Sequence, residues 1–150
     1  MIFMHNKNNL GTKKMESMNK DVEHPEHYKT LVRFKEPECI LFSQCLSFCL
    51  GNAFKYVWRA GKKGDPIVDL DKAAWYVRQS YSACVDCSQK IENELESARR
   101  TMLVFFFHLD FTPLGEIGEA KEKALFSIII GNHSEALQSI EELKRKFGEL

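Results

Sequence analysis

The sequence predicts an all-α protein: an irregular helical bundle with an extended N-terminal arm and a C-terminal helical hairpin. Three observations support this prediction. Apolar residues recur with a spacing near 3.6 over most of the chain after residue 38. Glycine, proline and asparagine separate these segments at short intervals. The chain has 150 residues, which is room for about five or six such helices in one domain.

The composition is that of an ordinary globular protein, and it excludes several classes. Lys plus Arg and Asp plus Glu each number 21, so the formal net charge is zero. A dedicated duplex-DNA binder needs a surplus of cations. The longest apolar run, Met102–Phe107, has six residues, whereas a membrane span needs about 20. The polar N-terminus lacks the apolar core of a secretory signal. Five cysteines, an odd count, indicate reduced thiols. We therefore expect a cytoplasmic protein.

The N-terminal part is expected to lack regular structure. Residues 1–20 are rich in asparagine and lysine and show no apolar period, which predicts a disordered leader. Residues 21–37 are expected to form the arm, because Pro25 imposes an extended backbone on His24.

Three helices are expected to follow the arm. The first covers residues 38–50 and is interrupted at Gly51, and Asn52 then caps a second helix that runs to about residue 60. After a lysine- and glycine-rich turn, one long helix is expected over residues 66–100.

The sequence of the C-terminal part predicts a helical hairpin. Residues 101–112 are apolar, and their period does not distinguish a buried helix from a short strand. Helices are then expected over 116–130 and 134–147, with Ser134 as the N-cap of the second. The hairpin is similar to one unit of a tetratricopeptide array, but a single unit favours a bundle or an oligomer-forming hairpin.

A strip of positive charge follows residue 50. Asn52, Lys55 and Arg59 are spaced i, i+3 and i+7, so they share one face of a helix, and Lys62 continues the charge into the turn. Guanidinium and ammonium groups in such a strip suit phosphate oxygens. The ordinary alternative is a solvated helix face.

The next helix repeats the same spacing with a different set of side chains. Asp69, Lys72 and Tyr76 are spaced i, i+3 and i+7, and Trp75 or Tyr76 could stack on a base. If the two helices are antiparallel neighbours, these groups form a nucleotide pocket. The alternative is that Trp58 and Trp75 are core residues.

Two weaker patterns could hold a metal ion. His24 and His27 flank a carboxylate. Four thiols could make a zinc site from the pair Cys84 and Cys87 with the pair Cys45 and Cys49, and Cys39 lies elsewhere. Neither set has the spacing or turns of a known zinc module, so docking of the arm and small buried cysteines are the preferred interpretations. No metal site is therefore predicted. The chain also lacks the P-loop motif G-x-x-x-x-G-K-[ST].

The motifs together resemble a known family. His24-Pro25-x-His27-Tyr28, the stretch Gly51–Gly64 and the run Asp69-Leu70-x-Lys72-Ala73-x-Trp75-Tyr76 are similar to small phage and prophage proteins. Most of that family is a domain of unknown function, and many members are described as nucleotide kinases. The resemblance covers roughly residues 24–80. Its motif residues here are His24, His27, Tyr28, Asn52, Lys55, Tyr56, Arg59, Lys62, Asp69, Lys72, Trp75 and Tyr76.

The resemblance implies a nucleotide-binding protein of the host-cell cytoplasm. It places a nucleotide-kinase-like phage domain at residues 21–98, between the leader 1–20 and a C-terminal helical extension 99–150. The enzyme hypothesis is a (deoxy)nucleoside monophosphate kinase without a P-loop, with Mg²⁺ as its cofactor. The alternative is a non-catalytic binder that sequesters a nucleotide signal or inhibits a host protein in counter-defence. A homo-oligomer is expected in either case, with no membrane or duplex-DNA partner.

Overall fold

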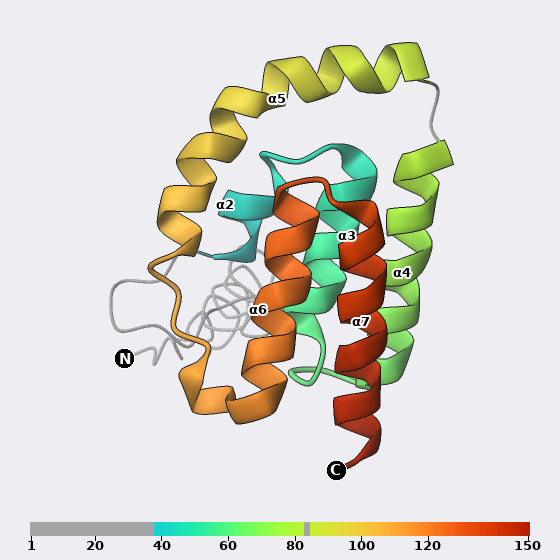
Figure 1. Cartoon of the computed structure of the whole chain (residues 1–150), viewed down its shortest axis with the longest axis vertical. Helices are drawn as coiled ribbons and strands as arrows, with labels where there is room; N and C mark the ends of the chain where they lie inside the picture. The colour runs from blue at the N-terminus through green and yellow to red at the C-terminus, as the bar shows by residue number, and fades with distance from the viewer. Residues whose placement is uncertain (1–37, 83–84) are drawn as a thin grey trace, which may run out of the picture.

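The computed structural model describes residues 38–82 and 85–150, and the side chains of all of these except 85–95. Every regular element in this part is helical, which confirms the predicted all-α class (Figure 1). The predicted leader and arm lie outside the described residues. The elements are α2 (Cys39–Ser43), α3 (Phe48–Arg59), α4 (Pro66–Ser82), α5 (Val85–Phe106), the 3₁₀ turn η2 (Thr112–Leu114), α6 (Gly115–Ile129) and α7 (His133–Gly148).

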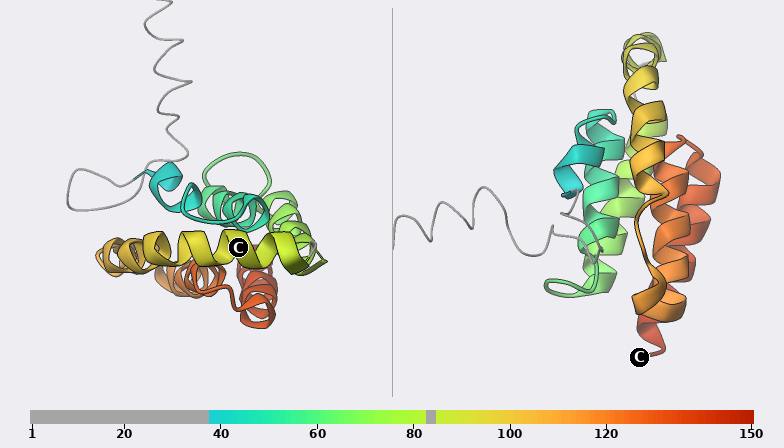
Figure 2. Two further views of the ribbon diagram at one scale, coloured as in Figure 1. Left: turned by 90° about the horizontal axis from the view of Figure 1, so that it is seen from above. Right: turned by 90° about the vertical axis from the view of Figure 1, so that its left-hand side faces the viewer.

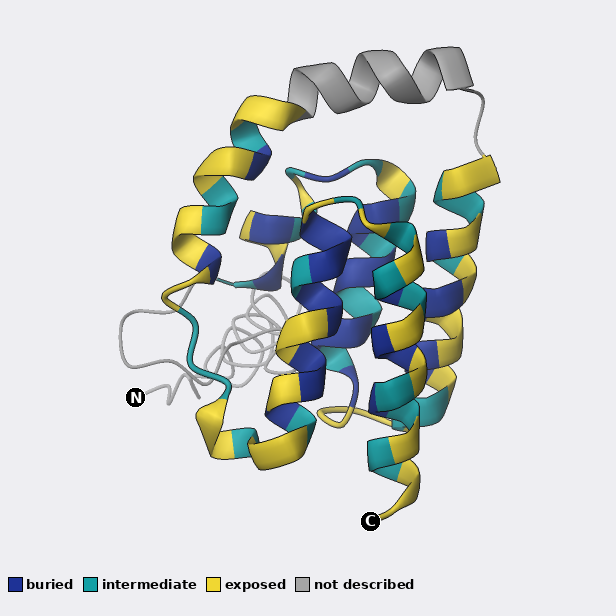
Figure 3. Cartoon of the chain, in the orientation of Figure 1, coloured by how far each residue is buried: buried dark blue, intermediate teal, exposed yellow. Residues whose placement is uncertain are grey.

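Four helices enclose the core. The antiparallel pair α3–α4 packs on the pair α6–α7, with α3 against α6 and α4 against α7, so that two layers face each other (Figure 2). The buried side of each helix points to the shared interior, and the exposed side points outward (Figure 3). Burying these apolar faces is the main source of stability. Fully buried residues include Phe54, Val57, Leu70, Val77, Leu125, Ile128, Ile140 and Leu143.

The helix predicted over 38–50 is wrong in its extent. The chain leaves the helical path after Ser43, and α3 begins at Phe48 and continues through Gly51 and Asn52. Gly51 does not break the helix. It allows the backbone near Ser43 to pack closely on α3, because a Cβ at residue 51 would lie 2.6 Å from the carbonyl oxygen of Ser43. Asn52 is not an N-cap, since its side-chain amide donates to the Phe48 carbonyl at 2.8 Å within the helix.

The single long helix predicted over 66–100 is also wrong. α4 ends at Ser82, and α5 begins at Val85. The physical reason is length: with 17 residues, α4 already matches the 16 residues of α7 against which it packs. A straight continuation would leave the bundle. Instead, α5 passes over the end of the bundle and leads back toward α6 (Figure 1).

The ambiguous stretch 101–112 is helical in its first half. α5 continues to Phe106, whose ring is buried and lies near the rings of Phe42, Phe111 and Phe126 at centroid distances of 6.2, 5.8 and 6.2 Å. These contacts attach the end of α5 to the bundle.

The C-terminal hairpin is confirmed, with α6 and α7 close to the predicted bounds. Its N-cap differs from the prediction. Asn132, not Ser134, caps α7, because its Oδ1 accepts a hydrogen bond of 3.1 Å from the backbone N–H of Glu135. Gly131, with φ +71°, makes the turn before it.

The hairpin shares the core with α3 and α4, and the boundary predicted between residues 98 and 99 falls inside α5. Within the described residues, no helix is both long and apolar enough to cross a bilayer.

Candidate functional site

The predicted site residues of α3 and α4 meet through an ion pair. Arg59, in the last turn of α3, donates from Nε to one carboxylate oxygen of Asp69 at 2.9 Å and from a terminal nitrogen to the other. Asp69 lies in the first turn of α4 and is 3% exposed. The bidentate geometry fixes the guanidinium plane and compensates the buried carboxylate.

Three cationic side chains, one of them Arg59 of this pair, lie close to a single aromatic ring. The Tyr56 ring centroid lies 4.9 Å from Lys55 Nζ, 5.1 Å from Arg59 Cζ and 5.5 Å from Lys72 Nζ. Lys55 Nζ also donates to Asn52 Oδ1 at 2.9 Å, which restrains that ammonium. We call Lys55, Tyr56, Arg59 and Lys72 the Tyr56 cluster. The sequence spacing brought these residues onto two faces, and antiparallel packing of α3 and α4 brings the faces together.

Aromatic rings continue from this cluster toward the other end of α4. Tyr76 stacks on Tyr56, with centroids 5.9 Å apart and planes at 18°. Trp75 meets Tyr76 edge to face at 4.9 Å, and Phe48 does so at 6.3 Å. The outer rings are accessible, with Trp75 52% and Phe48 78% exposed. We call Phe48, Tyr56, Trp75 and Tyr76 the aromatic row.

The structure places Lys62 apart from the Tyr56 cluster. Its Nζ lies 5.3 Å from the ring centroid of Trp58, a core residue that is 2% exposed. The interpretation of Trp58 as core is therefore confirmed. Trp75, by contrast, is on the surface.

Lys121 of α6 is a buried cation that the sequence analysis missed. It is 3% exposed, and its Nζ donates to the Ala60 carbonyl at the end of α3, at 2.8 Å. The Lys121 pKa is lowered from 10.5 to about 7, chiefly by burial and then by the positive charge of Lys62, while Asp69 opposes the shift. Its position could have indicated burial, because Lys121 lies four residues after Ile117 and three before Ala124 on the apolar face of α6.

The residues considered for a metal are only partly described. His24, His27 and Tyr28 lie outside the described residues, as do the side chains of Cys84 and Cys87. Burial raises the Cys39 pKa from 9.0 to about 12, so that thiol stays protonated at neutral pH. In the part of the chain that is described, no group of three or more His, Cys, Asp and Glu side chains is arranged to hold a metal ion.

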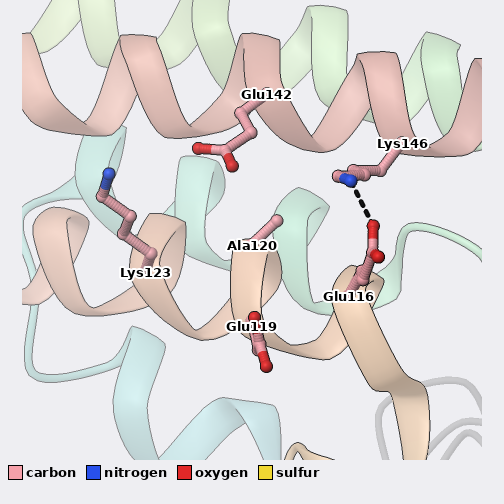
Figure 4. A pocket seen from close by; sticks show the side chains of 6 residues that line it. All are labelled: Glu116, Glu119, Ala120, Lys123, Glu142 and Lys146. Carbon is pink, nitrogen blue, oxygen red and sulfur yellow. Dashed lines mark hydrogen bonds and ion pairs between the residues drawn. The ribbon is translucent and has the colours of Figure 1, made fainter.

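A pocket of about 350 Å³ lies between α6 and α7, away from the predicted site. Glu116 and Lys146 form an ion pair across it, and this contact lowers the pKa of Glu116 and raises that of Lys146 (Figure 4). Carboxylates and ammonium groups both line it, so its charge does not select an anion or a cation. The lining residues are Glu116, Glu119, Ala120, Lys123, Glu142 and Lys146.

Comparison with known proteins places the site within a matched segment. Residues 22–78 match the model of a family described as a protein of unknown function, DUF3310. The Gene 1.7 protein of Enterobacteria phage T3 is 41% identical over an alignment of 63 residues, and the match covers 37% of this chain and 39% of that protein. The chain thus spans about two fifths of that relative. No solved structure matches significantly. The segment that carries α2, α3 and most of α4 therefore matches a family without an assigned function, and part of the chain is similar to a phage protein.

Proposed function

We propose that the protein binds a nucleotide on the outer surface of α3 and α4. The phosphate groups lie on the Tyr56 cluster, and the base stacks on Trp75. The observation that carries the proposal is the gathering of three cations within 5.5 Å of one tyrosine ring.

Electrostatics favour an anion at this place. The site holds three positive charges, on Lys55, Arg59 and Lys72, and one negative charge, on Asp69. Like charges at this separation repel, and a phosphate would relieve the repulsion. Arg59 is oriented by Asp69 and Lys55 by Asn52, so part of the ordering cost of binding is met before the ligand arrives.

Trp75 and Tyr76 supply the second half of nucleotide recognition. Trp75 is half exposed and supported edge-on by Tyr76, so one indole face can receive a base. Tyr76 also stacks on Tyr56, which links the base position to the cation position. Cation and aromatic groups side by side match the two chemical halves of a nucleotide.

Binding has more geometric support than phosphoryl transfer. Asp69 is the candidate carboxylate for Mg²⁺ or a sugar hydroxyl in a kinase, but both of its oxygens accept hydrogen bonds from Arg59 and the residue is buried. A kinase would need this pair to open or another group to supply the carboxylate. The resemblance of the motifs to phage proteins described as nucleotide kinases keeps monophosphate phosphorylation as the second candidate. Self-association and a host-protein partner stay predictions.

Calorimetric titration with deoxynucleoside monophosphates and triphosphates, and with the matching nucleosides, tests the proposal. We expect nucleotides to bind at least about tenfold more tightly than nucleosides, because one good charge-assisted contact contributes about 1.5–3 kcal/mol. Lys72→Ala should weaken nucleotide binding about tenfold. Lys72 is the better target than Arg59, since removing Arg59 would also leave a buried carboxylate uncompensated.

Arg78→Ala is the matched control, because Arg78 is another exposed cation of α4. It should leave nucleotide affinity unchanged. Equal affinity for nucleosides and nucleotides, or equal losses in the two variants, would contradict the proposal. A parallel assay for a diphosphate product, with a triphosphate donor and Mg²⁺, separates the two candidates: turnover supports the kinase, and binding without turnover supports sequestration.

A further inference from the structure

We infer that the aromatic row and the Tyr56 cluster together form a binding platform for single-stranded nucleic acid, with Phe48 as a stacking residue for a base that a mononucleotide would not reach. This inference rests on the proposed nucleotide site and extends it along the surface. It assigns a role to Phe48, which neither the motif nor the predicted site includes.

The first argument is the exposure of the outer rings. Phe48 is 78% exposed at the start of α3, and Trp75 is 52% exposed on α4. Both rings lie edge to face with the half-buried Tyr76, at centroid distances of 6.3 and 4.9 Å, so Tyr76 is a common support for the two. Exposed aromatic rings held in fixed orientation are the sequence-tolerant stacking surfaces of single-strand binders, since every base has a π-face.

The second argument is the placement of charge along the same strip. On α3, residues Phe48, Asn52, Tyr56 and Arg59 follow one another at helical spacing, and Lys55 lies beside them. The aromatic end at Phe48 therefore leads directly to the cations around Tyr56. From Phe48 to Arg59 the helix rises about 16 Å, which is room for about five stacked nucleotides at roughly 3.4 Å each.

The third argument concerns the kind of nucleic acid. Paired bases inside a duplex cannot offer their faces to Phe48 and Trp75, whereas unpaired bases can. The chain is electrically neutral as a whole, so a local patch of three cations suits a few phosphates better than a long duplex. The occupant that matches both the rings and the charges is a short single strand.

Fluorescence polarisation with end-labelled eight-nucleotide strands tests the inference, using oligo(dT) and oligo(rU) in separate arms to distinguish DNA from RNA. Thymidine monophosphate is titrated calorimetrically in the same buffer. We expect an oligonucleotide to bind at least tenfold more tightly than the monophosphate. The affinity should fall with salt with a logarithmic slope near −2, as expected for about three neutralised phosphates on a single strand.

Phe48→Leu keeps an apolar side chain but removes the stacking ring. It should weaken oligonucleotide binding about tenfold and leave monophosphate binding unchanged. Phe105→Leu is the matched control, because Phe105 is also an exposed phenylalanine, 52% accessible, on the distant α5. It should change neither affinity.

The outcomes separate this inference from the proposed function. If the monophosphate binds but the oligonucleotide binds no more tightly, the platform is refuted and the nucleotide site stands. If neither binds, both proposals fail. Equal competition by inorganic polyphosphate, or an unchanged oligonucleotide affinity in Phe48→Leu, would show binding by charge alone and would overturn the stacking role of Phe48.

Discussion

At the scale of single residues, charged side chains connect neighbouring helices. Arg59 and Asp69 pair across α3 and α4, and Lys121 reaches from α6 to the carbonyl of Ala60 at the end of α3. All three lie close to the turn that follows α3. A buried ammonium is costly because it loses its hydration, and a single carbonyl replaces that hydration only in part. The charge state of Lys121 is therefore linked to stability.

The link predicts a pH dependence with a definite sign. The Lys121 pKa is about 7 in the folded chain and 10.5 as its ordinary value, so between these pH values the unfolded chain binds more protons. The free energy of unfolding should rise with pH across that window. Between pH 7 and pH 9, the free energy of unfolding of the wild type should rise by about 2 kcal/mol more than that of Lys121→Met. Urea unfolding followed by circular dichroism at several pH values measures this gain.

The urea unfolding experiment stays at or below pH 9 because the Cys39 thiol affects stability above that pH. The Cys39 pKa is raised from 9.0 to about 12, so above pH 9 the unfolded chain loses a proton that the folded chain keeps, and stability falls. A wild-type curve parallel to that of Lys121→Met between pH 7 and pH 9 would contradict the lowered pKa of Lys121.

At the scale of the elements, helix ends are decided by which backbone groups find partners. α7 begins where Asn132 accepts from the N–H of Glu135, although Ser134 is an equally suitable capping residue by type. The left-handed Gly131 directs the chain so that Asn132 meets the first turn. Local residue type allowed either start, and the turn geometry selected one.

Replacing the cap tests this assignment. Asn132→Ala should lower the free energy of unfolding by about 1 kcal/mol, because the N–H of Glu135 loses its acceptor. Ser134→Ala, two residues later and exposed, should change it by less than about 0.5 kcal/mol. Thermal unfolding of both variants provides the comparison. A larger loss in Ser134→Ala would return the cap to the position expected from the sequence.

At the scale of the whole molecule, the C-terminal hairpin completes the domain that carries the site. α3 packs on α6 and α4 on α7, and buried residues of all four helices form one cluster. Polar links reinforce the packing: His133 lies 2.8 Å from the Ser80 hydroxyl, and Lys144 pairs with Asp71 at 2.8 Å. The segment that matches the family of unknown function is therefore covered on its inner side by residues outside the match.

This shared core predicts cooperative unfolding. Leu125→Ala on α6 removes a fully buried side chain and should cost about 2–5 kcal/mol. The loss should appear equally in circular dichroism and in the fluorescence of Trp58, which is buried on α3. Ile130→Ala, a change of similar size at a residue 44% exposed, is the control and should cost under about 1 kcal/mol. A Trp58 transition that Leu125→Ala does not shift would indicate that residues 21–98 fold as a separate domain.

The candidate site was more predictable than the helix boundaries. The spacing of Asn52, Lys55 and Arg59, and of Asp69 and Lys72, depends only on the helical repeat, so one sequence suffices to place each set on a face. Phe48 lies in the stretch 38–50, whose apolar period predicts a helix with a buried face, yet it is 78% exposed. An apolar period shows which residues share one face of a helix, but it does not show which of them another helix will cover.

The sequence by itself determined the helical class, the C-terminal hairpin and the residues that share each helix face, because these follow from local periodicity and turn chemistry. Only the tertiary structure decided that α4 and α5 are separate helices, that Gly51 packs against Ser43, and that Arg59 pairs with Asp69. Those outcomes depend on distances between segments far apart in the chain. Such distances are fixed when the four helices bury their apolar faces against one another.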